Sequence, residues 1–511
     1  MERGNVTDLF FSHAEKSPGQ CAIVDGKSRI TYGELANEVR QTAAYFQSKG
    51  IEKGDKVLVF VPMGIDLYRT VLALFDLGAV VLFLDEWVSR ERLEVCCQLA
   101  DCKALIGGWK VTLLSVLSKE LRKMPIKLGL NYKKGLSYNK NATTASDLAL
   151  ITFTTGSTGI PKAAIRSHSH LKNQFEALVE KIQPEEGEID MPVLPIVLLI
   201  NLGAGCTSVI APFKSKKAQK MKPQIMVKLM QDEKVNRLVS SPYFAIRVAE
   251  YCTENKISIP NLKKVFTGGA PVFPDEAALL VDGFQDAEVT VVYGSTEAEP
   301  ISAIAAKSVR EENPDQKKGL CVGSVHRTTE LIILPITDHA ISVNSAKELE
   351  EMKLKVGGTG EICVAGSHVL ESYLDNEEAV LRNKIRVDGK CWHRTGDSGF
   401  VDKEGMLYLT GRAGNVFEKN KVVYSPFILE YEMKQLSEVS VGTVLKINEL
   451  VVLFVELKDA SKGTDFLLKK FPFVDKVVVG KLPKDPRHFS KIDYGKLKEK
   501  YISSNHKQLN K

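Results

Sequence analysis

The chain has 511 residues, 44% of them hydrophobic and 26% charged, with 69 Lys and Arg against 63 Asp and Glu for a net charge of +6. Because its 37 Gly and 20 Pro are neither enriched nor periodic, this composition excludes a disordered or collagen-like chain. A net charge of +6 over such a length makes no concentrated basic patch, so we expect no nucleic-acid partner.

The cysteines and the first residues bear on the location of the protein. The nine Cys are scattered without a CxxC pair, which fits a reducing compartment. Near the start, only residues 9–11 form an apolar run, and a signal peptide needs a longer one. We therefore expect a cytoplasmic protein that is not exported.

Helical and strand-like segments alternate through the first hundred residues. Residues 32–50 are amphipathic, residues 56–61 (KVLVFV) form an apolar run, residues 66–77 have a helical pattern, and residues 80–84 are apolar again. This alternation predicts βαβ units and a parallel sheet that is covered on both faces.

Residues 191–213 contain no charged residue and are long enough to cross a bilayer. Pro, Gly and polar residues divide this stretch into short pieces, which favours a buried strand, loop and helix beside a cavity. We therefore expect no transmembrane segment. Residues 237–240, 264–267 and 289–293 are predicted strands that continue the α/β pattern.

Shorter strands with turns begin near residue 320, for example at residues 331–335 and 406–410. We predict an α/β protein whose large N-terminal domain, residues 1–411, holds two α/β subdomains and this β-rich section. A Gly-containing hinge at residues 412–415 then leads to a small, mobile α+β C-terminal domain, residues 416–511.

A phosphate-binding loop follows the predicted strand at residues 148–153. Backbone N–H groups, hydroxyls and one lysine can surround a polyphosphate there. No GK[ST] sequence follows, so the loop is not a Walker A motif, and a simple surface turn would not need the whole string. Its members are Thr154, Thr155, Gly156, Ser157, Thr158, Gly159, Ile160, Pro161 and Lys162.

Four further strings follow in a fixed order: Gly268-Gly269-Ala270-Pro271, Tyr293-Gly294-Ser295-Thr296-Glu297, Thr395-Gly396-Asp397 and Gly411-Arg412. Together with the loop, their order and separation resemble the signature motifs of the adenylate-forming superfamily. That superfamily includes acyl-CoA synthetases, firefly luciferase and nonribosomal peptide adenylation domains. The resemblance covers roughly residues 5–500 and implies an enzyme that uses ATP and Mg²⁺.

The resemblance implies how adenine and the phosphates are held. Tyr293 would offer an aromatic plane to adenine, and the small residues Gly269, Ala270 and Pro271 would line its other face. The loop of residues 154–162 would hold the β- and γ-phosphates.

Roles at the α-phosphate and ribose follow from the same resemblance. Thr296 would contact the α-phosphate, and Glu297 would be the Mg²⁺ ligand. Asp397 would accept hydrogen bonds from both ribose hydroxyls, and Arg412 would contact ribose and phosphate.

The catalytic lysine of this superfamily corresponds to Lys491, within the string Arg487-His488-Phe489-Ser490-Lys491-Ile492-Asp493. We expect Lys491 to bridge the oxygens of the acyl carboxylate and the α-phosphate, with Thr296 and Glu297 as the other catalytic residues. The alternative is one more solvated lysine in a basic tail.

Two departures from the common pattern concern the second reaction step and the substrate. Gly414 replaces the usual hinge acid, and Glu418 and Lys421 replace a Lys and a Gly in the loop that lines the pantetheine entrance of thioester-forming members. Residues 195–202 lack the His that many relatives carry near the acyl carboxylate and are largely aliphatic, which is consistent with a long apolar acyl chain.

These departures point to one branch of the superfamily, the β-lactone synthetases of bacterial olefin biosynthesis, which are often labelled fatty acid CoA ligases. The chain resembles them in four segments: residues 188–209, residues 268–272 (GGAPV), residues 293–298 (YGSTEA) and the ending Arg-His-x-x-Lys-Ile at residues 487–492. The resemblance implies activation of a fatty acid, with or without a β-hydroxyl group, as acyl-AMP, followed by transfer to CoA or by closure of a β-lactone. Two alternatives are an acyl-AMP ligase that loads an acyl carrier protein and a non-catalytic acyl or nucleotide binder. The intact motif set speaks against the last.

Overall fold

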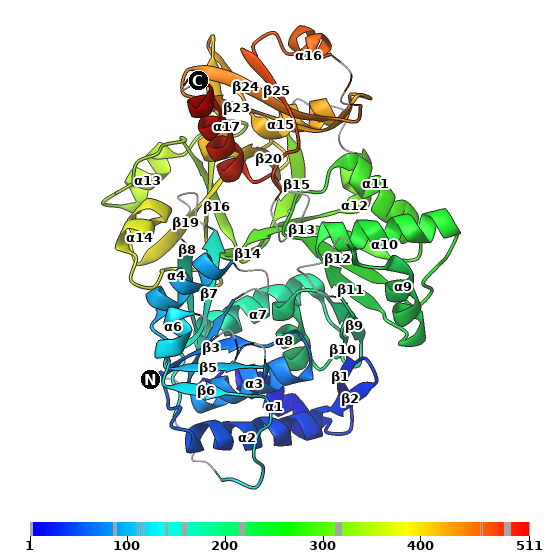
Figure 1. Cartoon of the computed structure of the whole chain (residues 1–511), viewed down its shortest axis with the longest axis vertical. Coiled ribbons are helices and arrows are strands. Elements are labelled where there is room, and N and C mark those ends of the chain that lie inside the picture. Colours follow the sequence, from blue (N-terminus) through cyan, green and yellow to red (C-terminus); the bar gives the residue numbers. More distant parts are fainter. Residues whose placement is uncertain are drawn as a thin grey trace.

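A computed structural model describes the chain from residue 4 to residue 509, apart from residues 85–88, 110, 112, 114, 116–117, 138–139, 141, 156–160, 214–219, 312–318, 460, 462 and 485–491. Helices and strands alternate through most of it, and the strands form two large sheets and two small ones (Figure 1). The predicted α/β class is confirmed. Within the described parts, no helix is long and apolar enough to cross a membrane.

A six-stranded sheet carries the first α/β unit. Its order is β6 (Ile126–Leu128), β5 (Ala104–Gly107), β3 (Lys56–Phe60), β4 (Val80–Phe83), β7 (Leu148–Thr155) and β8 (Pro161–Ser167). The pairs are parallel except for the last, β7 and β8, which form an antiparallel hairpin.

Helices cover both faces of this sheet, as its apolar strands predict. Val57 and Val59 pack with helices α2 (Tyr32–Ser48) and α3 (Ile65–Leu77), whereas Leu58 between them packs with α4 (Arg90–Ala100). Successive strand residues point to opposite faces, so a fully apolar strand needs cover on both sides. The short helix α6 (Lys119–Lys123) lies beside α4.

The second large sheet has 14 strands among the described residues, and its first part is mostly parallel. The antiparallel strand β2 (Ser28–Thr31) forms its edge, followed by β1 (Cys21–Asp25), β10 (Thr207–Val209), β9 (Ile189–Pro192), β11 (Arg237–Ser240), β12 (Lys264–Gly268) and β13 (Glu288–Ser295). Its helices are α1 (Thr7–Lys16), α7 (His168–Ile182), α8 (Pro195–Ala204), α9 (Pro223–Asp232), α10 (Pro242–Asn255), α11 (Pro274–Gly283) and α12 (Ala306–Glu311).

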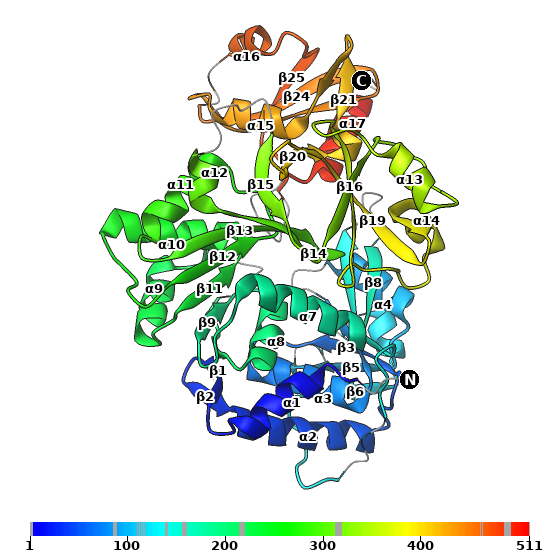
Figure 2. The same ribbon diagram turned by 180° about the vertical axis from the view of Figure 1, so that it is seen from behind.

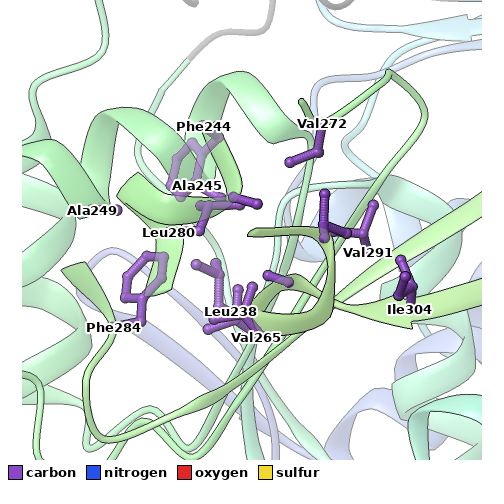
Figure 3. Close-up of a cluster of buried hydrophobic side chains, with 14 of the residues drawn as sticks. Leu238, Phe244, Ala245, Ala249, Val265, Val272, Leu280, Phe284, Val291 and Ile304 are labelled. Atoms are coloured by element: carbon purple, nitrogen blue, oxygen red, sulfur yellow. The ribbon is translucent and has the colours of Figure 1, made fainter. Parts of the chain in front are cut away.

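Residues 191–213 therefore fold as the end of a strand, a ten-residue helix and a further strand, as expected. On one face of the sheet, Leu238 and Val265 pack against Phe244, Ala245 and Leu280 of helices α10 and α11 (Figure 3). This packing fixes the carboxyl ends of β11, β12 and β13, where the candidate nucleotide motifs lie.

The same sheet continues as the predicted β-rich section, now antiparallel. Its strands run in the order β14 (Ala298–Ala305), β15 (Leu320–Val325), β20 (Met406–Arg412), β19 (Lys390–Val401), β17 (Gly360–Ala365) and β16 (Glu330–Leu334). Strand β18 (Lys384–Val387) pairs with β19, and helices α13 (Ala346–Met352) and α14 (Glu377–Asn383) lie beside this end. Figure 2 shows this section from behind.

A 3₁₀ turn, η2 (Ala413–Asn415), leads from β20 into the C-terminal elements at the top of Figure 1. These elements have a small core of their own around Met433, Leu453 and Phe471. They are β21 (Phe417–Lys419), β22 (Val422–Tyr424), α15 (Pro426–Lys434), β23 (Val439–Ile447), β24 (Leu450–Leu457), α16 (Asp465–Lys470), β25 (Lys476–Val479) and α17 (Tyr494–Leu509).

Helix α15 packs against the start of α11, in a contact that we call the α11–α15 contact. The Phe273 ring lies 5.4 Å from the Phe427 ring and 5.5 Å from the Tyr431 ring, measured between centroids. Lys434 Nζ lies 2.9 Å from Asp275 Oδ2 and 3.1 Å from Glu276 Oε1. Burial opposes the charge of Lys434, but the two acids outweigh it and raise the pKa of this amine.

Candidate active site

The predicted phosphate loop joins the two strands of the β7–β8 hairpin. Thr154 pairs with Lys162, and Thr155 pairs with Pro161. Gly156, Ser157, Thr158 and Gly159, together with the Thr155 side chain, lie outside the described residues. Thr154 Oγ1 is buried and has no hydrogen-bond partner within the described chain. A buried hydroxyl without a partner is costly, so this atom suits a polar ligand.

Lys162 points from this hairpin toward residues 370–384. Its Nζ lies 5.1 Å from the centroid of the Tyr373 ring and donates to Asn383 Oδ1 at 3.3 Å. Burial lowers the pKa of Lys162, although the carboxylate of Glu297 acts in the opposite direction. The amine is thus a partly desolvated cation, which would interact strongly with phosphate oxygens.

Thr296 and Glu297 form the turn between β13 and β14. Glu297 is 9% exposed, and its Oε1 accepts a hydrogen bond from Tyr373 Oη at 3.3 Å. The backbone of the same turn is held by Leu370 N, which donates to Glu297 O at 2.7 Å, and by Arg166 Nη2, which donates to Thr296 O at 2.6 Å. Arg166 comes from β8, so the phosphate hairpin and this turn are tied together.

Tyr293, Asp397 and Arg412 meet on neighbouring parts of the large sheet. Tyr293 Oη donates to Asp397 Oδ2 at 2.8 Å, and Arg412 Nη1 lies 3.0 Å from Asp397 Oδ1. Asp397 and Arg412 are directly paired in register across β19 and β20. The Asp397 carboxylate raises the pKa of Arg412, so this guanidinium is firmly charged.

The segment Gly268-Gly269-Ala270-Pro271 follows β12, beside the end of β13. A Cβ atom on Gly268 would lie 2.6 Å from Val292 O, and Gly269 has a φ of +85°. Side chains are therefore excluded by space at the first position and disfavoured by backbone conformation at the second. The small residues leave room beside Tyr293 at the carboxyl ends of parallel strands, which is where α/β sheets commonly bind ligands.

Lys491 lies outside the described residues, but both flanks of its segment are placed. Lys484 and Ile492 form an isolated β-bridge, and Tyr494, at the start of α17, donates to Glu430 Oε1 at 2.5 Å. Tyr494 also lies near enough to Arg412 for each charge to affect the pKa of the other. The segment that carries Lys491 therefore ends beside the Arg412 side of the site.

The two departures from the common pattern lie in different surroundings. Glu418 and Lys421 are exposed on the β21–β22 hairpin, where Lys421 has a φ of +64°. By contrast, the aliphatic residues of α8 are packed. Leu198 and Leu202 pack in the core around α2 and α3. The other face forms an apolar cluster with helix α7 and with strands β11 and β12, made of Leu178, Ile182, Val197, Ile200, Val239 and Phe266.

Buried acids lie near α8, but they are already paired. Asp190 and Glu188 both contact Arg237, which is completely buried. Asn201 of α8 joins the cluster by donating to Asp190 Oδ2 at 2.7 Å and by accepting from Arg237 Nη2 at 2.6 Å. These carboxylates are thus neutralised from within and hold α8 on the sheet.

Three residues at the site were not predicted: Arg166, Tyr373 and Lys384. They belong to none of the strings, and each acts through a contact with a distant segment. Their neighbours in the sequence offered no usable sign; Arg166, for example, simply follows the short apolar run of residues 163–165.

Comparison with known proteins defines the class. A family profile described as AMP-binding enzyme matches residues 10–374, more than half of the chain. The chain therefore belongs to the AMP-binding enzyme family and is an adenylate-forming enzyme of the ligase type, as its motifs indicated.

Particular relatives agree with this class. Olefin beta-lactone synthetase of Xanthomonas campestris is 29% identical, over 86% of this chain and 82% of its own. The enzyme of the same name from Stenotrophomonas maltophilia is 29% identical, over 78% of this chain and 76% of its own.

Solved structures share the fold. Amide bond synthetase McbA of Marinactinospora thermotolerans superposes with a TM-score of 0.79 at 18% identity, over 97% of this chain and 99% of its own. O-succinylbenzoate Coenzyme A synthetase of Bacillus subtilis superposes with a TM-score of 0.78 at 18% identity, over 96% of this chain and 97% of its own.

Proposed function

We propose that this enzyme activates a fatty carboxylic acid with ATP as acyl-AMP, releases pyrophosphate, and then closes a β-lactone when the acid carries a β-hydroxyl group. One observation carries the proposal: three motifs from separate segments are held together by side-chain contacts. Arg166 of the phosphate hairpin donates to the turn that holds Glu297, and Tyr373 donates to the Glu297 carboxylate. Tyr293, at the end of the strand before this turn, donates to Asp397, which pairs with Arg412.

In the first step, an oxygen of the fatty carboxylate attacks the α-phosphorus of ATP, and the bond to pyrophosphate breaks. Lys162 would neutralise the β- and γ-phosphates, Asp397 would hold the ribose, and Arg412 would contact ribose and phosphate. Lys491 would bridge the attacking carboxylate and the α-phosphate. These groups act by position and charge, which is how phosphoryl transfer is mainly catalysed.

Glu297 has the donor chemistry for a Mg²⁺ ion that accompanies ATP. Its carboxylate is largely buried and accepts a hydrogen bond from the hydroxyl of Tyr373 at 3.3 Å, so acceptor capacity remains for a metal. Oxygen ligands suit this ion, which would neutralise charge that develops on the phosphate oxygens. Thr154 Oγ1 is a second uncommitted oxygen on the facing hairpin.

The acyl chain would lie along the apolar cluster of α7 and α8. Val197 and Ile200 present aliphatic groups there, and no His or unpaired acid of the described residues interrupts them. A fatty chain gains free energy from such a wall, whereas a substrate with an ammonium group would lack a partner.

In the second step, the β-hydroxyl oxygen of the substrate attacks the carbonyl carbon of acyl-AMP. The new C–O bond closes the four-membered ring, AMP leaves, and the hydroxyl proton is released. Because the nucleophile belongs to the substrate, no external thiol is required, and Glu418 and Lys421 can replace the usual pantetheine-loop residues. The β-lactone synthetases among the relatives favour this step over transfer to CoA or to a carrier protein.

We also propose a cytoplasmic location, because all nine cysteines, which lie in the described parts, are free thiols.

A pyrophosphate-release assay with mass spectrometry of the products tests the proposal. Palmitate and 3-hydroxypalmitate are compared, each with and without CoA and with and without an acyl carrier protein. We expect a neutral lactone and AMP from the hydroxy acid without CoA, and bound acyl-AMP from palmitate. Rapid palmitoyl-CoA formation without any lactone would make the enzyme a CoA ligase, and no pyrophosphate from either acid would reject fatty-acid activation.

A further inference from the structure

Lys384, the first residue of β18, is a buried lysine that the proposed reaction does not use. It is 4% exposed, and within the described chain it forms no ion pair with a carboxylate. Burial lowers the pKa of its amine to about 8. Placing an ammonium group in such surroundings is costly unless its contacts compensate.

Its contacts are with one short segment, residues 370–373. Lys384 Nζ donates to the carbonyl oxygen of Leu370 and lies 5.5 Å from the centroid of the Tyr373 ring. A carbonyl dipole and an aromatic face both stabilise a cation. Lys384 therefore fixes both ends of this segment relative to β18.

The same two residues hold Glu297. Leu370 N donates to the backbone oxygen of Glu297, and Tyr373 Oη donates to its carboxylate. Leu370 thus binds Lys384 through its carbonyl and Glu297 through its N–H, so a shift of this residue would move Glu297 directly.

The segment also contacts the phosphate hairpin. Lys162 Nζ lies over the same Tyr373 ring, at 5.1 Å, and Asn383, next to Lys384, accepts its hydrogen bond at 3.3 Å. Tyr373 itself forms an isolated β-bridge with Ala164 of β8. Both proposed phosphate-side groups, Lys162 and Glu297, are therefore oriented by residues that Lys384 holds in place.

We propose that Lys384 is a positioning residue for Mg²⁺–ATP: it fixes residues 370–373, and these orient the Glu297 carboxylate toward the metal. The inference rests on the proposed role of Glu297 as the metal ligand. Residues that orient a ligand in this way typically contribute about 10–100-fold to metal affinity.

The test measures ATP binding by calorimetry over a series of Mg²⁺ concentrations, without acyl substrate, on the full chain. We compare Lys384→Met, Tyr373→Phe, Glu297→Gln and the matched control Lys390→Met. Lys390 is an exposed lysine at the far end of the β18–β19 hairpin, where it pairs with Glu330. Thermal unfolding is recorded for each variant.

We expect Lys384→Met to raise the Mg²⁺ concentration for half-maximal ATP binding about tenfold, and Lys390→Met to leave it unchanged. Tyr373→Phe should raise this Mg²⁺ concentration as well. The double variant Lys384→Met and Tyr373→Phe should need little more Mg²⁺ than Lys384→Met alone, because both changes act through residues 370–373. If Lys384→Met fails to fold, the Mg²⁺ midpoint is measured in Tyr373→Phe instead. A raised midpoint there supports the orientation of Glu297 by residues 370–373, and an unchanged midpoint overturns it.

A raised midpoint in Glu297→Gln together with a wild-type midpoint in Lys384→Met would overturn the role of Lys384 alone. A lowered unfolding temperature with an unchanged midpoint would make Lys384 a purely structural residue and would overturn it equally. An unchanged midpoint in Glu297→Gln would instead reject the metal site on which the inference rests.

Discussion

Asp397 contacts two side chains at once: it accepts a hydrogen bond from the hydroxyl of Tyr293 and forms an ion pair with the guanidinium of Arg412. In the proposed site Asp397 also accepts hydrogen bonds from the ribose hydroxyls, so its negative charge stabilises both contacts within the protein and contacts with the nucleotide. Asp397→Asn keeps the shape but replaces one carboxylate oxygen with an NH₂ group, which donates.

We therefore expect Asp397→Asn to weaken ATP binding by about 10–100-fold, the equivalent of about 1.5–3 kcal/mol for hydrogen bonds to a charged group. Calorimetric titration with ATP measures this. Asp338→Asn, at an exposed loop position, serves as the control and should bind ATP normally. Normal affinity in Asp397→Asn would remove Asp397 from the nucleotide site.

Lys491→Ala should abolish pyrophosphate release while ATP binding survives. The lysine would act on the transition state, whereas the other nucleotide contacts lie between residues 154 and 412. Pyrophosphate release and ATP titration on the same sample separate the two effects. Nearly normal turnover would show that another cation performs this role.

Residues within strings could be proposed for the site from the sequence, because a motif places several residues of matching chemistry side by side, and their roles toward the nucleotide stay predictions. Tyr293, Glu297 and Asp397 belong to this group. Arg166 and Lys384 could not be predicted, because each stands alone in the sequence and gains its contacts from segments that are distant in the chain. Single buried cations carry no local pattern that distinguishes them from surface residues.

Strand β11 shows how one element depends on buried charge. Its first residue, Arg237, is enclosed by Glu188, Asp190 and Asn201, which belong to the region before β9, to β9 and to α8. The cluster thus joins two strands and the helix that forms the proposed acyl wall.

Removing the cation leaves the buried Asp190 carboxylate without its ion-pair partner and leaves Glu188 with Lys264 alone, at 3.3 Å, so Arg237→Met should destabilise the protein by about 3–5 kcal/mol. Urea unfolding followed by circular dichroism measures this. Adding Asp190→Asn should recover part of the loss, because one uncompensated charge disappears. A stability loss below about 1 kcal/mol would mean that water or rearrangement satisfies the acids.

Predicted strands and helices match the structure where apolar runs are bounded by turn residues, as at β3, β11 and β12. The pairing of strands across the large sheet could not be predicted. For example, β15 lies between β14 and β20, and its pairing with β20 joins residues more than eighty positions apart, such as Leu320 and Leu409, which no local period encodes.

For the molecule as a whole, the α11–α15 contact couples the C-terminal elements to the segment beside the proposed adenine site. Phe273 and Glu276 follow Gly268-Gly269-Ala270-Pro271 directly, and Glu276 Oε2 also accepts from Phe273 N at 2.9 Å. Any displacement of α15 would therefore disturb residues close to the nucleotide.

Lys434→Glu would place a third acid beside Asp275 and Glu276, so we expect pyrophosphate release to fall about tenfold, equivalent to about 1.4 kcal/mol. The double variant Lys434→Glu and Asp275→Lys should recover most of the lost rate of pyrophosphate release. Steady-state kinetics with ATP and a fatty acid checks both. Equal activity in the single variant and the wild type would show that this contact does not hold the C-terminal part for adenylation.

The spread of the site along the chain also has a consequence for synthesis on the ribosome. Lys162 and Arg412 are separated by roughly 250 residues, so at about 5–20 residues per second the β7–β8 hairpin would emerge some 12–50 s before Arg412. During that interval a nascent chain would hold Lys162 and the uncommitted Thr154 hydroxyl without Arg412, which is proposed to contact the same nucleotide. With the residue roles proposed above, full affinity for ATP would be gained near the end of translation, and ATP would add little to the stability of early folding intermediates.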